Sequence, residues 1–391
     1  MLTGIAWDHR RCWGPLEASI DLYAAATGVG VRWDRRSLYS FGEGDLSGYT
    51  DAYDLVIFDH PFVGEGMSRG LLLDLQQFLT DEDRHNFDRD AVGASWRSYA
   101  YGGGIWALPI DAAAQTAAWR ADLLARHDLA VPQTLEAVLA LASKLQAHGM
   151  SVAWPSVPTD LMCTLVSVAA SMGLRPGHEG DDFLALADAE IIVAQLKALA
   201  AIAHPQSQRW NPILCLNAMA QGDEIAYAPY LFNYVNYATN EMGKPITFGP
   251  SPRIAADLPA HTILGGAGIG ISAKSANPQA AFAYAKYLCS PQFQSGTYVI
   301  AGGQPGSRTA WQSAESDRHT AGFFSSTLPA LDSAFLRPTH PGFVGFFHDA
   351  TLRLAEVVHA EAPLRPFTDW LNASYARIRA GAVPAIAGAA Q

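Results

Sequence analysis

Two pairs of polar side chains are of the types that bind metal ions. His9 and His60 offer imidazole nitrogens, and Asp8 and Asp59 offer carboxylate oxygens. They would form a cluster if the loops after the first and third predicted strands meet. Coordination also needs a fixed geometry and outer hydrogen bonds that orient the ligands. We therefore predict hydrogen-bonding loop residues here and no bound metal.

The motifs of the common enzyme classes do not occur in the sequence. The glycines of 266–270 have GxGxG spacing rather than the GxGxxG of dinucleotide-binding turns. There is no GxxxxGK[ST] phosphate loop, no HExxH zinc helix and no GxSxG nucleophile turn. We predict no catalytic residue and no cofactor, and a binding protein rather than an enzyme.

Aromatic residues stand at loop positions beside polar ones. Trp7-Asp8-His9 follows a predicted strand, as does Asp59-His60-Pro61-Phe62; Trp154-Pro155 precedes a predicted helix, and so does the loop 338–343, which ends in Phe343. Sugar rings have flat apolar faces edged by hydroxyls, so their receptors combine aromatic platforms with carboxylate, amide and imidazole groups. The pattern favours a binding site for a small polar solute.

Composition excludes two classes of partner. The formal net charge is −11 and no basic stripe occurs, whereas nucleic-acid binding needs clustered Lys and Arg. No run approaches the roughly 20 apolar residues that would span a bilayer, since even 191–203 is interrupted by Gln195 and Lys197. With 391 residues, 49% of them hydrophobic, the chain can bury two substantial cores.

Strand-like and helix-like segments alternate along the chain. The clearest helix is expected over 131–149, with Thr134 as its cap and Gly149 near its end. Asn277-Pro278 should start another, which ends before Ser290-Pro291. This alternation predicts an α/β fold whose parallel-rich sheet has helices on both faces. In such sheets ligands bind beyond the carboxyl ends of strands.

The segment 101–145 carries a family resemblance. Its pattern consists of Gly104, Trp106, Leu108-Pro109, Asp122-Leu123-Leu124 and Pro132-Gln133-Thr134. It resembles the hinge-and-crossover segment of the extracellular solute-binding proteins that feed ABC importers, in the maltose-binding-like (type II) branch. Arg120 stands where that family usually has Asn.

Three further blocks resemble the same family, in the family's order: 53–75, 265–294 and 302–311. The resemblance implies two α/β lobes joined by crossover strands near Asp111, Gly265 and Gly306. The first lobe would comprise residues 1–110 plus 265–305, and the second 111–264 plus 306–391.

The resemblance also implies a ligand site in the cleft between the lobes. Tyr230, after Pro229, resembles a Pro-aromatic platform of sugar-binding relatives, and the adjacent Gly265 and Gly266 would let backbone approach a ligand or the facing lobe closely. For each aromatic residue the alternative is core packing. The expected ligand-binding residues are Trp7, Asp8, His9, His60, Phe62, Asp111, Trp154, Tyr230, Gly265, Gly266 and Phe343.

The implied function is non-enzymatic capture of a carbohydrate or carbohydrate derivative, delivered by a monomer to ABC transporter permease subunits. A sensor or an enzyme built on the same fold is the alternative class. The run 112–114 is Ala-Ala-Ala, without the carboxylate frequent in sugar-binding relatives, and His9, Arg10 and His60 could meet a carboxylate. A small carboxylate or aromatic acid is therefore an alternative ligand.

The first residues do not have the basic start and the apolar run of about 7–15 residues of a secretory leader. We expect a mature periplasmic or extracellular chain with an added Met, with a cytoplasmic protein as the alternative. The four cysteines, Cys12, Cys163, Cys215 and Cys289, lie far apart without CxxC spacing, which fits free thiols and disulfides equally.

Overall fold

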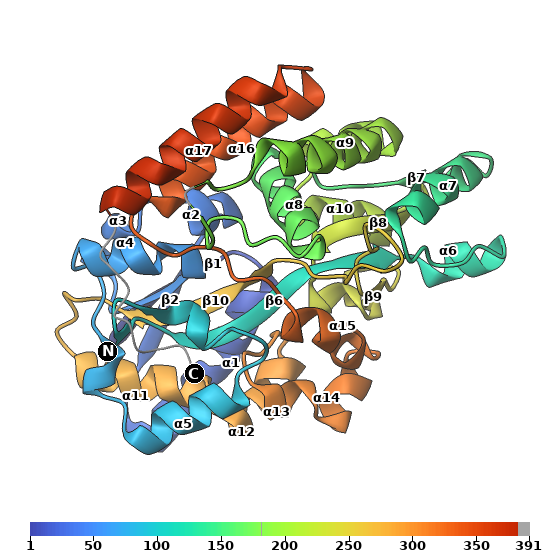
Figure 1. Ribbon diagram of the computed structural model, residues 1–391. Coiled ribbons are helices and arrows are strands. Elements are labelled where there is room, and N and C mark those ends of the chain that lie inside the picture. The colour runs from blue at the N-terminus through green and yellow to red at the C-terminus, as the bar shows by residue number, and fades with distance from the viewer. Residues whose placement is uncertain (181, 382–391) are drawn as a thin grey trace.

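The structure is a computed structural model that describes residues 1–180 and 182–381, apart from the side chain of residue 43. Strands and helices alternate over most of this length (Figure 1). The strands are β1 (Leu2–Trp7), β2 (Val31–Arg36), β3 (Leu55–Phe58), β4 (Ala100–Tyr101), β5 (Gly104–Ile105), β6 (Leu108–Trp119), β7 (Ser151–Val152), β8 (Ile225–Phe232), β9 (Thr247–Gly249) and β10 (Leu264–Ile271).

The helices cover the faces and ends of the strands (Figure 1). They are α1 (Arg10–Thr27), α2 (Leu38–Glu43), α3 (Ser47–Ala52), α4 (Val63–Ser68), α5 (Asp81–Asp90), α6 (Ala121–Arg126), α7 (Leu135–Gln146), α8 (Pro158–Ser171), α9 (Leu186–Ile202), α10 (Pro212–Gln221), α11 (Pro278–Leu288), α12 (Pro291–Phe293), α13 (Arg308–Trp311), α14 (Ala314–His319), α15 (Phe323–Asp332), α16 (Phe343–His359) and α17 (Leu364–Gly381).

The main sheet has the strand order β2-β1-β3-β10-β6-β8-β7, with β9 also pairing with β6. β1 is parallel to β2 and β3, and β7 is parallel to β8, but β10 is antiparallel to both of its neighbours and β6 to β8 and β9. The sheet is therefore mixed, and the prediction of a parallel-rich sheet was wrong. The reason is that β10 returns alongside β6 in the opposite direction.

Strand β6 joins two regions of the sheet. Its first half, 108–114, pairs with β10, and its second half, from Gln115 to Trp119, pairs with β8 and β9. Figure 1 shows β6 and β10 running across the middle of the molecule, with β1 and β2 toward one end and β8 and β9 toward the other. Each end of this long strand thus contributes to a different hydrophobic core.

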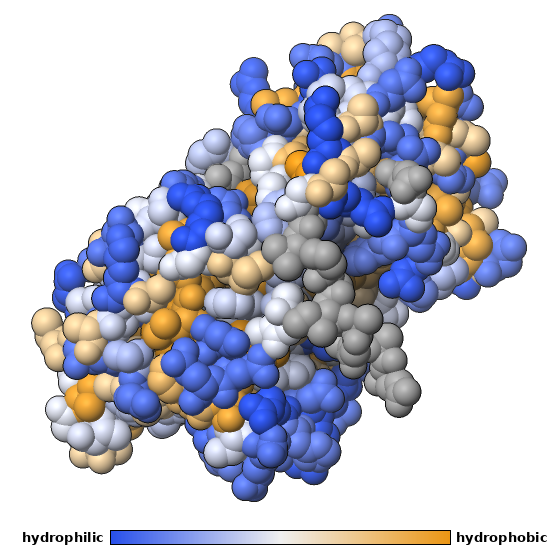
Figure 2. All heavy atoms as spheres, turned by 60° about the vertical axis from the view of Figure 1, so that its left-hand side comes forward, coloured by the Kyte–Doolittle hydropathy of each residue, from blue (hydrophilic) through white to orange (hydrophobic). Residues whose placement is uncertain are grey.

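One large apolar cluster combines the sheet end at β1 to β3 with α1 and α11, and includes Leu16, Ile57 and Leu288. Another combines α7, α8, α9, α16 and α17, and includes Leu196 and Leu354. Burial of these side chains is the main favourable contribution to folding. Hydrophilic residues dominate the face in Figure 2, with hydrophobic ones gathered in smaller patches between them.

The two helices expected from sequence are present. The hydroxyl of Thr134 caps α7 by accepting a hydrogen bond from the Ala137 N–H at 3.2 Å, and Gly149 has a positive φ of 71° shortly after the helix. Helix α11 starts at Pro278 and ends at Leu288, but the side chain of Asn277 makes no capping bond.

No helix in the described ranges is long and apolar enough to cross a membrane. All four cysteines are buried free thiols.

Candidate functional site

A cavity of about 450 Å³ lies at the loops that follow β1, β3 and β8. Its first wall comes from the chain before Asp111 and from β10. This wall consists of Trp7, Arg11, Leu38, Tyr39, Phe41, Gly42, Asp59, Pro61, Gly265 and Gly266.

The second wall comes mainly from the first turns of α8, α10 and α16 and from the end of β8. It consists of Ala113, Val157, Pro158, Thr159, Asp160, Cys163, Arg209, Asn211, Pro212, Phe232, Tyr234, Arg337, Phe343, Val344, Phe347, His348, Thr351 and Leu352. Pockets of this size accommodate small organic ligands.

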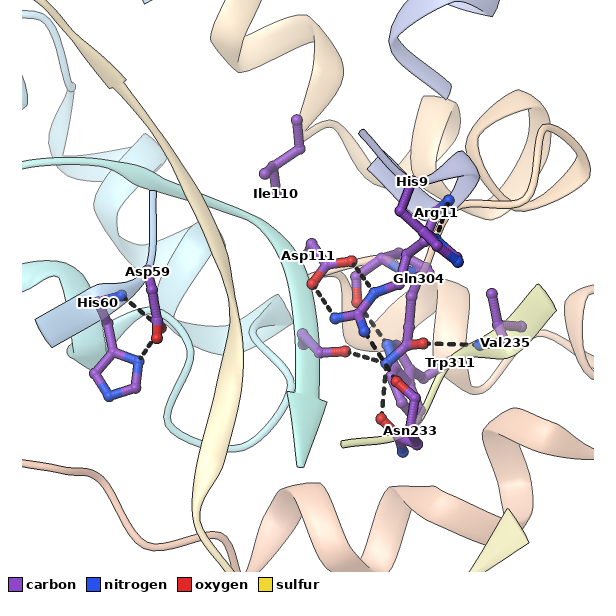
Figure 3. A network of polar contacts seen from close by, with 12 residues as sticks. His9, Arg11, Asp59, His60, Ile110, Asp111, Asn233, Val235, Gln304 and Trp311 are labelled. Atoms are coloured by element: carbon purple, nitrogen blue, oxygen red, sulfur yellow. Dashed lines mark hydrogen bonds and ion pairs between the residues drawn. The ribbon is translucent and has the colours of Figure 1, made fainter. Parts of the chain in front are cut away.

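Arg11 of the first wall forms a buried ion pair with Asp111, which does not line the cavity. Arg11, in the first turn of α1, donates from Nε to Asp111 Oδ2 at 2.7 Å and from Nη2 to Asp111 Oδ1 at 2.5 Å (Figure 3). Its Nη1 donates to the Asn233 carbonyl at 2.9 Å. Burial raises the pKa of Asp111, and the Arg11 guanidinium opposes that shift. The pair connects α1, β6 and the segment after β8.

Gln304 connects the same region to the chain before α13. Its Nε2 donates to the Ala112 carbonyl at 2.7 Å and to Asn233 Oδ1 at 3.0 Å, and its Oε1 accepts from the Val235 N–H at 3.1 Å (Figure 3). Because Gln304 is fully buried, these bonds are shielded from competing water. Three segments far apart in sequence are thereby held together beside the cavity.

A second buried charge pair belongs to the cavity wall itself. Arg337 Nη2 donates to Asp59 Oδ2 at 2.8 Å, and Asp59 Oδ1 accepts from the His60 N–H at 2.8 Å and lies 3.0 Å from His60 Nδ1. Burial disfavours the charge on Asp59, but Arg337 and His60 outweigh it and hold the pKa of Asp59 below its ordinary value. Burial also lowers the pKa of His60, against the effect of Asp59.

Two adjacent glycines of β10 form part of the first wall. Gly266 has φ of 118°, and a Cβ there would collide with the Asp111 carbonyl of β6. A Cβ on Gly265 would lie 2.5 Å from the ring of Phe232. Both positions therefore need glycine for local packing, and both line the cavity.

Comparison with known proteins identifies the family. A model of the bacterial extracellular solute-binding proteins matches residues 23–323. This chain belongs to that family. Among curated proteins, no sequence matches it significantly.

Solved structures show the same fold. Maltose-bound MalE3 of T. maritima superposes with a TM-score of 0.81 at 17% identity, over 96% of this chain and 98% of that one. An ABC transporter solute-binding protein from Agrobacterium radiobacter K84 in complex with ribitol has a TM-score of 0.78 at 19% identity, over 96% of this chain and 98% of that one. The GacH receptor of Streptomyces glaucescens was solved unliganded and with acarbose. It has a TM-score of 0.78 at 17% identity, over 96% of this chain and 97% of that one. The family's two-lobed type II α/β fold, expected from the sequence, is confirmed.

Of the eleven residues expected to bind ligand in this solute-binding protein, the structure brings four to the cavity. These are Trp7, Gly265, Gly266 and Phe343. The remaining residues lie elsewhere: Asp8, His9, His60, Phe62, Asp111, Trp154 and Tyr230.

Hydrogen bonds within the protein account for the positions of several of these residues. Trp154 is fully buried and donates from Nε1 to Thr164 Oγ1 at 3.2 Å. Tyr230, also fully buried, donates its hydroxyl hydrogen to the Pro252 carbonyl at 2.8 Å. His9 caps α1, where its Nδ1 accepts from the Arg11 N–H at 3.1 Å.

His60 and Asp111 support the wall indirectly through Asp59 and Arg11. Phe62 packs in an apolar cluster with Phe58, and Asp8 is exposed to solvent.

Sequence reasoning missed the two arginines that carry the buried charges. Arg11 directly follows Arg10, whose side chain is 45% exposed and pairs with Glu241 at the surface, and nothing in the local pattern distinguishes them. Arg337 precedes Pro338 in a loop whose most conspicuous residue is the aromatic Phe343 at its end. Asp59 was named from the sequence as a polar loop residue beside His60, but it was not included among the expected ligand-binding residues.

The site offers binding groups from many elements. Within the described ranges, no three His, Cys, Asp or Glu side chains come together in a way that could hold a metal ion. Helices α8 and α16 begin at the cavity, and neither has a side-chain capping bond at its N-terminus. Helix N-termini carry partial positive charge, which favours acceptor groups nearby.

Proposed function

We propose that this protein captures a small organic solute in the cavity and delivers it to the permease subunits of an ABC importer. The observation that carries the proposal is the cavity itself, which is lined on one side by the chain before Asp111 and β10 and on the other mainly by α8, α10, α16 and the end of β8. Family membership supports capture of a solute. In this proposal binding energy shifts a conformational equilibrium, and no covalent chemistry takes place.

The structural relatives supply a first ligand class to test. Their titles name maltose, ribitol and acarbose. These names support a carbohydrate, a polyol or a derivative of one as the solute.

We further propose lobes of 1–110 plus 265–305 and 111–264 plus 306–391, which close by rotation about the segments near Asp111, Gly265 and Gly306. The contacts of Gln304 and the Arg11–Asp111 pair lie where these segments meet. Buried and satisfied, they would remain intact during closure, while a few backbone torsions on either side absorb the rotation.

The family description supports a periplasmic or extracellular location. We propose a monomer, since the closed pair of lobes is the form that would be presented to the permease.

Small-angle scattering with and without a confirmed ligand tests the mechanism. Thermal-shift screening identifies that ligand first, because a solute at 100 times its Kd should stabilise the fold by about 2.7 kcal/mol. Starting from a demonstrably open unliganded form, saturation should reduce the radius of gyration. An unchanged radius of gyration at saturation would exclude hinge closure.

A further inference from the structure

Phenylalanine side chains form much of the apolar surface of the cavity. Phe41 faces it from the first wall, and Phe232, Phe343 and Phe347 from the second. Phenylalanine provides flat contact area but no hydrogen-bonding group. A solute that fills this space must present a sizeable apolar surface of its own.

Among the described residues, the buried side-chain atoms of the cavity wall that have no hydrogen-bond partner are N–H donors. Arg337 has five N–H donors, and in the described part of the chain its side chain makes one hydrogen bond, to Asp59, while its Nε has no partner. The indole N–H of Trp7, 3% exposed, also has no partner. Both side chains line the cavity.

The acceptors in the wall are the carboxylates of two aspartates and neutral groups such as those of Asn211 and Tyr234. Both oxygens of Asp59 accept from Arg337 and His60. The other carboxylate in the wall belongs to Asp160, in the first turn of α8. A sugar hydroxyl is both donor and acceptor, and a buried polar group without its partner is costly. Because the four phenylalanine rings offer no hydrogen-bonding group, a solute with hydroxyls on every side fits these walls less well than one with an apolar body.

The charges near the cavity do not repel an anion. Arg11, Arg209 and Arg337 line it, against Asp59 and Asp160, and Asp111 balances Arg11 from behind. A guanidinium group with free N–H donors matches the planar geometry of a carboxylate, and such charge-assisted bonds are stronger than neutral ones.

We infer that the solute is an amphiphilic carboxylate, with a compact, flat apolar body among the phenylalanines and one acidic head near Arg337 and Trp7. This inference rests on the proposed function and narrows its ligand class. It predicts that a small aromatic or alicyclic acid binds more tightly than an unmodified sugar or polyol.

Isothermal titration calorimetry with matched probes tests the inference. Benzoate, phenylacetate and cinnamate are each compared with the primary amide of the same acid, and with maltose, ribitol and tagatose. At least one acid should bind more tightly than its amide by about tenfold or more, the size expected for a lost charge-assisted hydrogen bond. The neutral sugars should bind more weakly than that acid.

The variant that tests the head is the double substitution Asp59→Asn/Arg337→Gln, which removes the ion pair without leaving one buried charge alone. It should reduce affinity for the acid by about tenfold or more and affinity for the amide by a smaller factor, because the amide carries no charge. Trp7→Phe, which keeps an aromatic ring and removes the indole N–H, should weaken acid binding by a smaller factor. The control is Arg353→Gln on α16, outside the cavity, where the guanidinium lies 4.3 Å from the Trp370 ring centroid.

Equal affinity for the acid and its amide would overturn the placement of an acidic head near Arg337 and Trp7. A folded double variant that still prefers the acid over the amide to the same degree would also overturn it. If a neutral sugar binds and closes the lobes while no acid binds at millimolar concentration, the ligand class is wrong and the proposed function stands. If neither class binds, the inference is also wrong. Failure of the proposed function would show separately, as a bound solute that leaves the lobes unmoved.

Discussion

Arg11 and Asp111, 100 residues apart in sequence, form a two-point ion pair in which Asp111 is 1% exposed and Arg11 3%. Removing both charges from water is costly, and the geometry of the pair with its additional bond to the Asn233 carbonyl offsets that cost. The pair joins α1 to the strand that crosses the molecule.

Asp111→Ala should lower the free energy of unfolding by about 3–5 kcal/mol, because it leaves a buried guanidinium without its counter-ion. Glu241→Ala, which breaks the surface pair with Arg10, is the matched control and should cost about 0–1 kcal/mol. Urea unfolding measures both. The double variant Arg11→Met/Asp111→Leu should be more stable than Asp111→Ala alone. If Asp111→Ala and Glu241→Ala lower the free energy of unfolding equally, this account is wrong.

His9 should make stability fall with acid. Burial, followed by the nearby Arg11, lowers the pKa of His9 from 6.5 to about 3. Between these values the unfolded chain binds a proton that the folded chain does not, so the free energy of unfolding decreases as pH falls, by up to about 1.4 kcal/mol per unit. Urea unfolding of wild type and His9→Asn from pH 7 to pH 4 measures the difference. Asparagine can still cap α1. If the free energy of unfolding changes with pH in the same way in both proteins, His9 is not the cause.

Gly266→Ala should destabilise the protein by about 1–3 kcal/mol, because φ of 118° is unfavourable for a residue with Cβ and the added carbon meets the Asp111 carbonyl. Gly345→Ala in α16, where a Cβ meets nothing within 4 Å, is the control and should be neutral or stabilising by up to about 1 kcal/mol. Thermal unfolding compares the two. A fully stable Gly266→Ala would mean that β10 adjusts without cost.

Tyr230→Phe separates a core role from a ligand-binding role. Loss of its bond to the buried Pro252 carbonyl should lower the free energy of unfolding by about 1–3 kcal/mol. Affinity for a confirmed solute should stay the same, because Tyr230 does not line the cavity. Calorimetric titration of the folded variant decides: a clear loss of affinity would support the ligand contact expected from sequence.

Features that depend on neighbours in the chain could be predicted from the sequence. Thr134 caps α7 because its hydroxyl needs only the Ala137 N–H three residues on, and Pro278 starts α11 because its ring fixes φ. The order of the family-like blocks indicated the two-lobed fold by resemblance. Trp7 and Phe343, chosen as aromatic residues at loop positions, line the cavity, and their contact with a ligand stays a prediction.

Only the tertiary structure decided which polar and aromatic groups share the cavity. Tyr230 and Trp154 look like platforms in the sequence, but their hydrogen bonds are satisfied inside the core. Arg337 meets Asp59 across 278 residues, and no local pattern encodes that meeting. Spacing along a chain determines which side chains share a face of a helix or strand, whereas contacts between distant loops depend on how whole elements pack, and so on every side chain in the cores between them.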